Sequence, residues 1–434
     1  MKNNLELDPL EQTKNSKASQ AFSWVKSPHA SEQDLLWLED LEKTLGLSLQ
    51  QLRQVFEWKL DAQIWKERHF FADLNKLRED ILEEKHLTPS QKRDHFFSGA
   101  RNLHQTLAAR LKEYPEQPAH ERHPTFRFLD KELKGEIKKL CPAASHKGVC
   151  CGLQTLNIVE NCAMGCSYCV LQNQYEEPLI KVPVNLAEKL SALSIDPSRR
   201  QRVCTGEYSD SLLWGNKNNI LTDLCQFARN NTNMVLELKT KSIQIEDLLK
   251  LDVPRNLVVS WSINSPLIIE HEERRTPSLR DRLAAAQEVA KRGIGIAFHL
   301  HPMIYYKGWE NDYTSLIEEL ISGFDPQSVL WVSLGTITYP RGLESELRRQ
   351  YTSSKIWQMD TEETPDGKIT YAYSVRQQLY AEALKALSPW KGKVYTYMCM
   401  EFQDMWEELY GFAYHDMESF NQDMNKHVWD KLGL

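Results

Sequence analysis

Two rhythms of apolar and polar positions divide the chain. From about residue 31 to 113, Leu, Trp, Val and Phe recur at intervals of three and four, as in "DLLWLEDLEKTLGLSLQQLRQVFEWKL". This spacing predicts amphipathic helices. Ser31 and Thr88-Pro89 are typical helix starts, and Gly46 is a typical helix end. The polar residues 1–30 predict a flexible leader, and the proline-marked segment 113–124 predicts a linker.

From residue 153 the rhythm changes, because short β-rich runs begin to alternate with helical segments. The six runs are 153–159, 202–208, 233–240, 256–263, 294–304 and 328–337. Alternating strands and helices with near-continuous apolar strands predict a parallel sheet covered by helices. Six such units favour an α/β fold with an incomplete (β/α)6 barrel, and "KVYTYMCM" (393–400) is a candidate seventh strand.

The same pattern predicts four regions along the chain. They are a leader (1–30), a helical N-terminal extension (31–148), a partial barrel (149–340), and a C-terminal hairpin with helices packing on the barrel (341–434).

Composition narrows the class of protein. Hydrophobic residues make up 41% of the chain, which is enough for a large core, and the net charge of −7 argues against coating nucleic acid over the whole surface. Residues 86–147 nevertheless hold more Lys and Arg than Asp and Glu, which fits either a solvated helical face or a nucleic-acid or partner patch. No run of 18 apolar residues exists, so we expect no membrane span. Nine cysteines without an apolar signal region predict a reducing, cytoplasmic location.

The segment "NCAMGCSYCVLQNQY" (161–175) concentrates the candidate chemistry, with Cys162, Cys166 and Cys169 within eight positions. It follows the first strand, at the end where barrel enzymes build their sites. Four-ligand zinc sites usually need a second Cys or His pair, which is not evident, and ferredoxin runs use other gaps. Three thiolates on a [4Fe–4S] cluster leave one iron open. The spacing therefore predicts a cluster that binds a small molecule.

"CAMGCSYC" resembles the CxxxCxxC signature of radical S-adenosylmethionine (SAM) enzymes, including Tyr168 before the last cysteine. The resemblance implies that Cys162, Cys166 and Cys169 bind a [4Fe–4S] cluster whose open iron binds the amino and carboxylate groups of SAM. It also implies reductive cleavage of SAM to a 5′-deoxyadenosyl radical, which abstracts a hydrogen atom from a substrate. An electron donor such as a flavodoxin or a ferredoxin would be a partner.

Polar residues at the ends of later strands are candidates for holding SAM. Gly206 and Glu207 in "TGEY" resemble the family's Gly-Gly-Glu motif, which binds the SAM ammonium. Lys241 is a candidate for the SAM carboxylate, Ser262 and Asn264 for ribose hydroxyls, and His299 shares a strand face with His301. Turn, solvated and structural roles are the alternatives for these residues.

The stretch 150–415 is also similar to the spore photoproduct lyase family, a DNA-repair branch of the radical SAM enzymes. The similar pieces include "CSYCVLQ", "SDSL", "ELKTKS", "VVSWSINSP", "WVSLGTI" and "YMCMEF". The resemblance implies that Tyr168, Ser209, Lys241 and Ser262 line the SAM site, and that the substrate is a thymine lesion in DNA.

Two positions depart from the family's hydrogen-return relay, in which a cysteine acts through neighbouring tyrosines. The donor cysteine falls on Glu207, and a relay tyrosine falls on Val170. The remaining catalytic candidates are Tyr168, Cys399 and Cys204. Cys204 lies three residues before Glu207, so alternation along the strand puts the two side chains on opposite faces. A structural role is the alternative for Cys399. The departures leave open a radical SAM enzyme acting on RNA, a modified nucleotide or a peptide. A zinc-bearing nucleic-acid-binding module is a third reading.

"TEETPDGKITYAYS" (361–374) carries Asp366-Gly367 between alternating runs, which predicts a β-hairpin with a two-residue loop. In the family a hairpin near this point inserts into DNA beside the flipped-out lesion. The resemblance makes Tyr371 and Tyr373 candidates for that insertion, and an ordinary surface hairpin is the alternative.

Overall fold

The computed structural model describes residues 16–25, 30–65, 67, 69–118, 127–145, 147–171, 179–351, 353–359 and 361–434. The chain forms two compact units, residues 1–113 with 348–360, and residues 114–347 with 361–434. Most of the predicted leader and the second half of the predicted linker lie outside the described residues. Residues 17–25 of that leader are helical, which corrects the prediction of a flexible segment there, because Ala18 and Ala21 are fully buried in the helical core.

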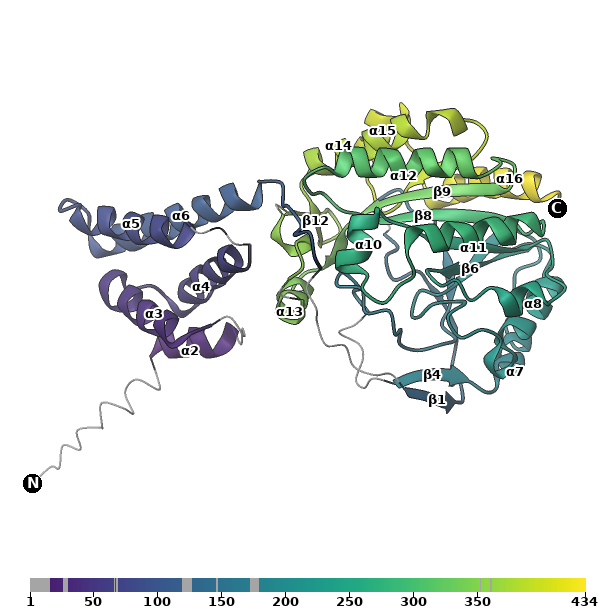
Figure 1. Cartoon of the computed structure of the whole chain (residues 1–434), viewed down its shortest axis with the longest axis horizontal. Helices are drawn as coiled ribbons and strands as arrows, with labels where there is room; N and C mark the ends of the chain where they lie inside the picture. Colours follow the sequence, from purple (N-terminus) through teal and green to yellow (C-terminus); the bar gives the residue numbers. More distant parts are fainter. Residues whose placement is uncertain are drawn as a thin grey trace, which may run out of the picture. The chain divides into compact units, whose positions relative to one another are not determined.

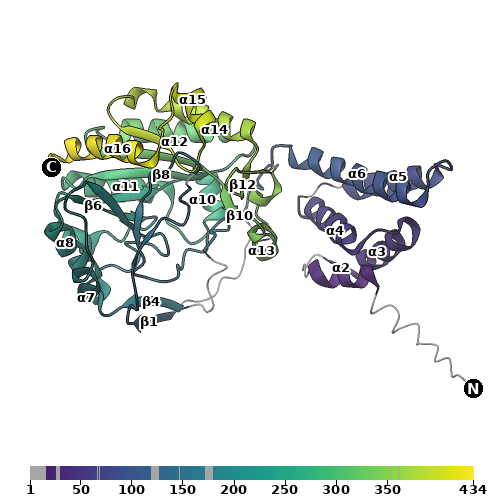
Figure 2. The same ribbon diagram turned by 180° about the vertical axis from the view of Figure 1, so that it is seen from behind.

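The first unit is built from the helices that the three-and-four spacing predicts, with one more at its start (Figure 2). They are α2 (Lys17–Val25), α3 (Glu32–Leu45), α4 (Leu49–Ile64), α5 (Phe70–Glu83) and α6 (Pro89–Ala108). Ser31 and Thr88 begin α3 and α6 with capping boxes, and Gly46 ends α3 in the left-handed conformation. The apolar stripes meet in a core that includes the fully buried Leu38, Phe56 and Phe96.

The second unit is organised around an eight-stranded sheet with the order β13-β9-β8-β7-β6-β5-β3-β2. The strands are β2 (Lys138–Leu140), β3 (Gln154–Leu156), β5 (Gln201–Thr205), β6 (Met234–Thr240), β7 (Leu257–Ser262), β8 (Ile296–Met303), β9 (Val329–Thr336) and β13 (Tyr395–Met398). From β3 to β13 all neighbours are parallel, and β2 closes the order by an antiparallel pairing. All six predicted strands are confirmed in adjacent places, and so is the seventh candidate.

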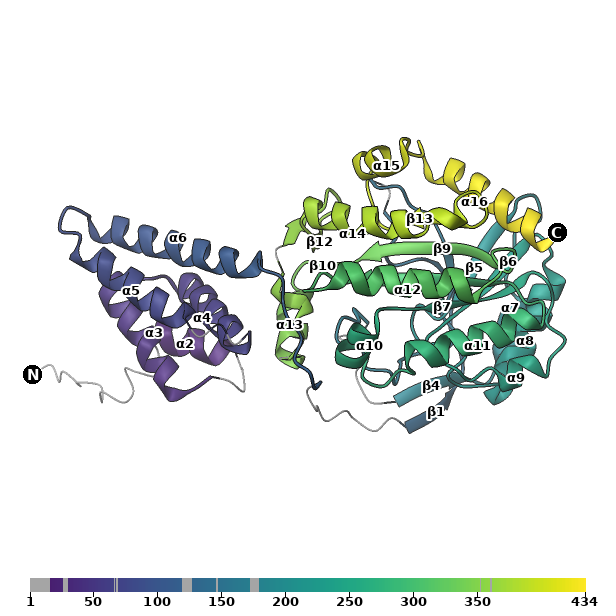
Figure 3. The same ribbon diagram turned by 45° about the horizontal axis from the view of Figure 1, so that its top comes forward.

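Helices cover the curved sheet, as the α/β prediction requires (Figure 1). They are α7 (Leu186–Ser191), α8 (Ile220–Asn230), α9 (Glu246–Leu249), α10 (Pro266–Glu272), α11 (Leu279–Lys291), α12 (Trp309–Gly323), α14 (Tyr373–Ala386), α15 (Gln403–Tyr410) and α16 (Met417–Leu432). Figure 3 shows α11 and α12 running along the outside of the strands β7 to β9. Every residue of β7 and β9 is buried, because helices and cavity side chains cover both of their faces. Among the described residues, no helix has the length and apolarity to cross a bilayer.

Smaller elements complete the chain. They are the paired parallel strands β1 (Arg127–Lys131) and β4 (Leu179–Pro183), the antiparallel strands β10 (Thr338–Pro340), β11 (Thr361–Glu363) and β12 (Lys368–Tyr371), the helix α13 (Leu343–Gln350), and the 3-10 turns η2 (Lys217–Asn219), η3 (Ile356–Gln358) and η4 (Ser388–Trp390). The sequence pattern indicated only β11 and β12 among these strands.

The predicted hairpin exists, but its loop and its tyrosines differ from the prediction. Thr364 N–H donates to the Lys368 carbonyl at 2.8 Å, so three residues form the loop, with Gly367 at φ +83°. Tyr371 is fully buried, which corrects its prediction as an inserting side chain. Tyr373 begins α14, where its hydroxyl donates to Glu408 Oε2 at 2.6 Å.

Candidate functional site

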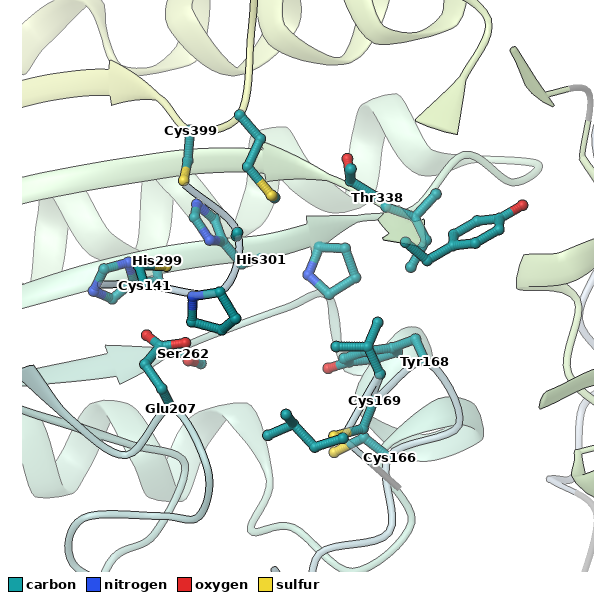
Figure 4. Close-up of a pocket in the computed structure, with 18 of the residues that line it drawn as sticks. Cys141, Cys166, Tyr168, Cys169, Glu207, Ser262, His299, His301, Thr338 and Cys399 are labelled. Carbon is teal, nitrogen blue, oxygen red and sulfur yellow. The ribbon is translucent and has the colours of Figure 1, made fainter. Parts of the chain in front are cut away.

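A cavity of about 680 Å³ lies at the carboxyl ends of the parallel strands. Its lining comes from the ends of β5, β6, β7, β8, β9 and β13 and from the three-cysteine loop, which we define as residues 161–171. Cys162, Cys166 and Cys169 all line this cavity. In the view of Figure 4, Cys166, Tyr168 and Cys169 lie together, apart from Glu207, Cys141, Cys399 and the two histidines.

Local backbone geometry makes the three-cysteine loop compact. Asn161 and Gly165 both take left-handed conformations, at φ +70° and φ +63°. The Cys169 N–H donates to the Cys166 carbonyl at 3.0 Å, and the Asn161 side chain donates to the Leu179 carbonyl at 2.6 Å. The loop therefore brings all three cysteines into the lining of one cavity.

The donor set of the loop fits a cluster better than a single ion. Across the described residues, no three His, Cys, Asp or Glu side chains converge closely enough to hold one ion. The thiolates of a [4Fe–4S] cluster each bind a different iron, so they need not converge on one point. None of the nine cysteines forms a disulfide. Burial raises the pKa of Cys166 to about 12, so metal binding would displace its proton.

Tyr168 and Lys241 join the three-cysteine loop to a buried carboxylate. The Lys241 ammonium lies 2.9 Å from Glu273 Oε1, 2.5 Å from the Tyr168 hydroxyl and 3.6 Å from Cys166 Sγ. The Tyr168 hydroxyl also donates to Glu273, whose second oxygen accepts from Arg282 at 2.6 Å. Burial alone would raise the pKa of Glu273, but Arg282 and Lys241 lower it to about 2. The Lys241 ammonium therefore lies beside Cys166, and the Glu273 carboxylate balances its positive charge.

Gly206 and Glu207 lie where β5 leaves the sheet, and both line the cavity. Gly206 has φ +92°, and a Cβ there would lie 2.4 Å from the Lys239 carbonyl oxygen, so only glycine fits. The Glu207 carboxylate accepts a hydrogen bond from Lys239 at 2.6 Å. Lys239 is a cavity residue that the sequence reasoning missed.

Ser209, Ser262 and His299 also line the cavity. The Ser209 hydroxyl donates to the Asn161 carbonyl at 2.6 Å, which ties the segment after β5 to the three-cysteine loop. His299 Nε2 lies 2.7 Å from Glu237 Oε1, and its buried Nδ1 has no hydrogen-bond partner among the described residues. A polar ligand in the cavity would satisfy such an atom.

Two of the predicted site residues, Asn264 and Cys204, lie outside the cavity lining. Asn264 is buried with its amide donating to the Pro302 carbonyl at 2.8 Å and its oxygen accepting from Tyr313 at 2.9 Å. Cys204 is fully buried and its thiol donates to the Thr205 carbonyl at 2.9 Å. Cys204 pairs with Glu237 in the register of β5 and β6, before the point along the chain where Gly206 and Glu207 enter the cavity wall.

Cys399 is the predicted catalytic thiol that reaches the cavity. It follows β13, and its N–H donates to the Leu334 carbonyl at 2.7 Å at the end of β9. Cys141 and Cys151 line the cavity as well, and Val170 lines it beside the last cysteine of the loop. The sequence reasoning did not select Cys141, because it lies well before the three-cysteine loop and outside any recognised spacing.

Glu273, Arg282 and Glu237 are buried polar residues that the sequence reasoning missed. Glu273 and Arg282 lie in the charged stretch "EHEERRTPSLRDR", which is typical of a solvated helix end. The sequence feature that could have indicated Glu237 as a buried polar residue is its position in the middle of the apolar run "NMVLELKT".

The fold and this site define an α/β partial-barrel protein with a three-cysteine loop at the carboxyl ends of its strands. A family model, "Spore photoproduct lyase", matches residues 151–388. Because that match covers more than half of the sequence, the chain belongs to the spore photoproduct lyase family.

Relatives of known identity are similar over part of their length. The chain is 28% identical over 169 residues to the spore photoproduct lyase of Clostridium acetobutylicum, covering 38% of this chain and 50% of that protein. It is 28% identical over 176 residues to that of Bacillus subtilis, covering 39% and 50%. The chain spans about half the length of the curated relatives it matches.

Solved structures support the fold. A cysteine-to-serine mutant of spore photoproduct lyase superposes with a TM-score of 0.54 at 20% identity, over 62% of this chain and 82% of that one. A mutant lyase with bound AdoMet and dinucleoside spore photoproduct gives a TM-score of 0.54 at 19% identity, over 63% and 82%.

Proposed function

We propose that this protein is a radical SAM enzyme of the spore photoproduct lyase type, acting on a thymine lesion in DNA or a related nucleotide. The observation that carries the proposal is that Cys162, Cys166 and Cys169 all line one cavity of about 680 Å³. The family membership and the AdoMet and spore photoproduct named for a related structure support it.

The residues of this chain would divide the work between binding and orientation. Cys162, Cys166 and Cys169 would hold a [4Fe–4S] cluster, which with SAM bound supplies a 5′-deoxyadenosyl radical. Lys241 and Tyr168 would orient SAM beside the cysteines, and Gly206, Ser209, Ser262 and His299 would bind its remaining groups. Glu207 would also face the SAM ammonium, and its pairing with Lys239 already fixes its direction. A flavodoxin or ferredoxin would supply the electron, and the cytoplasmic location stays a prediction.

We further propose that Cys399 returns a hydrogen atom to the substrate radical. Its S–H bond breaks as the substrate C–H bond forms, which leaves a thiyl radical on Cys399. One electron from the flavodoxin or ferredoxin and one proton restore the thiol. The cavity position of Cys399 supports this role over Cys204.

Anaerobic reconstitution tests the cofactor part of the proposal. The wild-type protein should turn brown, bind about four irons per chain, and release 5′-deoxyadenosine from SAM under reduction. Cys166→Ala should lose all three properties, whereas Cys225→Ala, which changes a buried cysteine outside the cavity, should keep them. Cleavage of SAM by the Cys166→Ala protein at the wild-type rate would refute the proposal, and one zinc with no iron would favour a zinc-bearing module.

A second candidate is the same radical chemistry on another substrate, such as RNA, a modified nucleotide or a peptide. The favouring observation is the Glu207–Lys239 ion pair in the cavity wall, together with Val170. Incubation of the reconstituted protein with dinucleoside spore photoproduct separates the two candidates. Thymidine product supports the lesion substrate, and SAM cleavage without thymidine supports the second candidate.

A further inference from the structure

Ser167 connects the three-cysteine loop to the end of α10. Its N–H donates to the backbone carbonyl of Glu272 at 2.9 Å, and its hydroxyl donates to Glu272 Oε2. Ser167 lies between Cys166 and Cys169 in the sequence, and both hydrogen-bonding partners are buried. The position of Glu272 therefore constrains the backbone that carries two of the three cysteines.

The other oxygen of the Glu272 carboxylate is held by Tyr114. The Tyr114 hydroxyl donates to Glu272 Oε1 at 2.7 Å. The Tyr114 ring packs against His271 and Tyr306, with centroid distances of 4.9 and 5.8 Å. Because these rings fix Tyr114 and only 1% of Glu272 is exposed, the carboxylate has a defined direction toward Ser167.

Burial makes this arrangement energetically demanding. A buried carboxylate needs hydrogen bonds to replace its lost water, and removing one donor leaves an oxygen less satisfied. Such a carboxylate moves or recruits water, and the residue bonded to its other oxygen moves with it. The Tyr114 hydroxyl and Ser167 are thus coupled through the Glu272 carboxylate that both of them contact, although Tyr114 does not line the cavity.

We propose that Tyr114 is a positioning residue for the three-cysteine loop, acting through Glu272 and Ser167. Tyr114 precedes the family match at residues 151–388 and is the first residue of the second unit along the chain. The segment that follows the helical unit therefore contributes to the cysteine site. This inference rests on the proposed function, because the loop that Tyr114 positions is the one proposed to hold the cluster.

The full-length chain with Tyr114→Phe tests the role, since this change removes the hydroxyl and keeps the ring. After anaerobic reconstitution, we expect the Phe variant to lose its iron–sulfur absorbance to a chelator severalfold faster than wild type. We also expect an altered electron paramagnetic resonance spectrum of the reduced cluster. Tyr414→Phe is the matched control, because it removes a tyrosine–carboxylate hydrogen bond to Asp423 at 2.5 Å in the C-terminal region, and it should leave both readouts unchanged.

Ser167→Ala provides a second route that does not depend on the stability of the tyrosine variant. Ser167→Ala should speed cluster loss as Tyr114→Phe does, and the double variant should be no worse than the stronger single variant, because both act through one carboxylate. Wild-type loss rates and spectra in Tyr114→Phe, or fully additive effects in the double variant, would overturn the inference. A wild-type protein that binds no iron–sulfur cluster would instead overturn the proposed function.

Discussion

The Lys239 ammonium donates to the Glu207 carboxylate across 2.6 Å, joining the ends of the neighbouring strands β5 and β6 at the cavity wall. The two side chains are only 20% and 18% exposed. Burial alone would lower the pKa of Lys239, but Glu207, Cys204 and Glu237 raise it well above its ordinary value. Glu207 is therefore a counter-charge for a buried lysine, besides being a candidate ligand for SAM.

Replacing Glu207 by Gln should lower the free energy of unfolding by about 2 kcal/mol, because Lys239 loses its charged hydrogen-bond partner. Urea unfolding of the purified protein measures the change. Lys250→Gln, which breaks an exposed ion pair with Asp247, is the control and should cost less than about 1 kcal/mol. Equal effects of the two variants would contradict the assignment of Glu207 as a structural partner of Lys239.

Gly206→Ala should destabilise the protein by about 3 kcal/mol, because the new Cβ meets a backbone oxygen at a positive φ. Gly308 is a close control, since it has the same φ of +92° but open space around its Cβ position. Gly308→Ala should cost about 1–2 kcal/mol from backbone strain alone. Thermal unfolding of both variants separates the backbone strain from the steric contact. Equal losses of stability in the two variants would show that the new Cβ at position 206 does not clash with the Lys239 carbonyl.

The stability of the protein should fall as the pH drops below about 6.5, in part because of His301. Burial, with help from His299 and Lys239, lowers the pKa of His301 well below 6.5. Below pH 6.5 the unfolded chain therefore binds a proton that the folded protein does not bind, which favours unfolding. Well above pH 6.5 the His301 imidazole is neutral in both the folded and the unfolded chain, and this effect of pH on stability vanishes.

His301→Gln should reduce the slope of unfolding free energy between pH 5 and 6.5 by up to about 1.4 kcal/mol per pH unit. Chemical denaturation at a series of pH values gives the slope. Replacing the exposed His415 by Gln should leave the slope as it is. An unchanged slope in His301→Gln would mean that His301 is protonated in the folded protein.

Tyr371→Ala should reduce stability by about 3–5 kcal/mol, because its ring is fully buried. Tyr371→Phe should keep the affinity for UV-damaged DNA, measured at one fixed salt concentration. If Tyr371→Ala stays as stable as wild type and loses only its preference for damaged DNA, the side chain inserts into DNA after all.

Local sequence patterns predict much of the fold, because strand and helix periods and caps depend on nearby residues. The six β-rich runs appear as adjacent parallel strands, and the spacing of Cys162, Cys166 and Cys169 places them on one cavity. The strands β1 and β4 escaped prediction, since β1 is short and mostly exposed and pairs with a strand 52 positions away.

The partners of the three-cysteine loop depend on packing that no local pattern carries. Glu272 and Glu273 lie in a run of charges, yet both are buried beside Ser167 and Tyr168. Asn264 follows a strand as a ligand-binding residue would, but Tyr313 and Pro302 from distant segments take up its side chain. Such roles require the three-dimensional arrangement of residues about 40 to 160 positions apart.

The short strand β2 has a consequence for self-association. A parallel sheet that ended at β3 would present unpaired backbone groups to other chains, which is a template for aggregation. The antiparallel β2 covers that edge with three residues, two of them lysines, and places Lys138 and Lys139 at the border of the sheet. A strand so short and so positively charged offers few backbone groups to a second molecule and repels another copy of itself. The strand β2 therefore opposes edge-to-edge pairing between the sheets of two molecules.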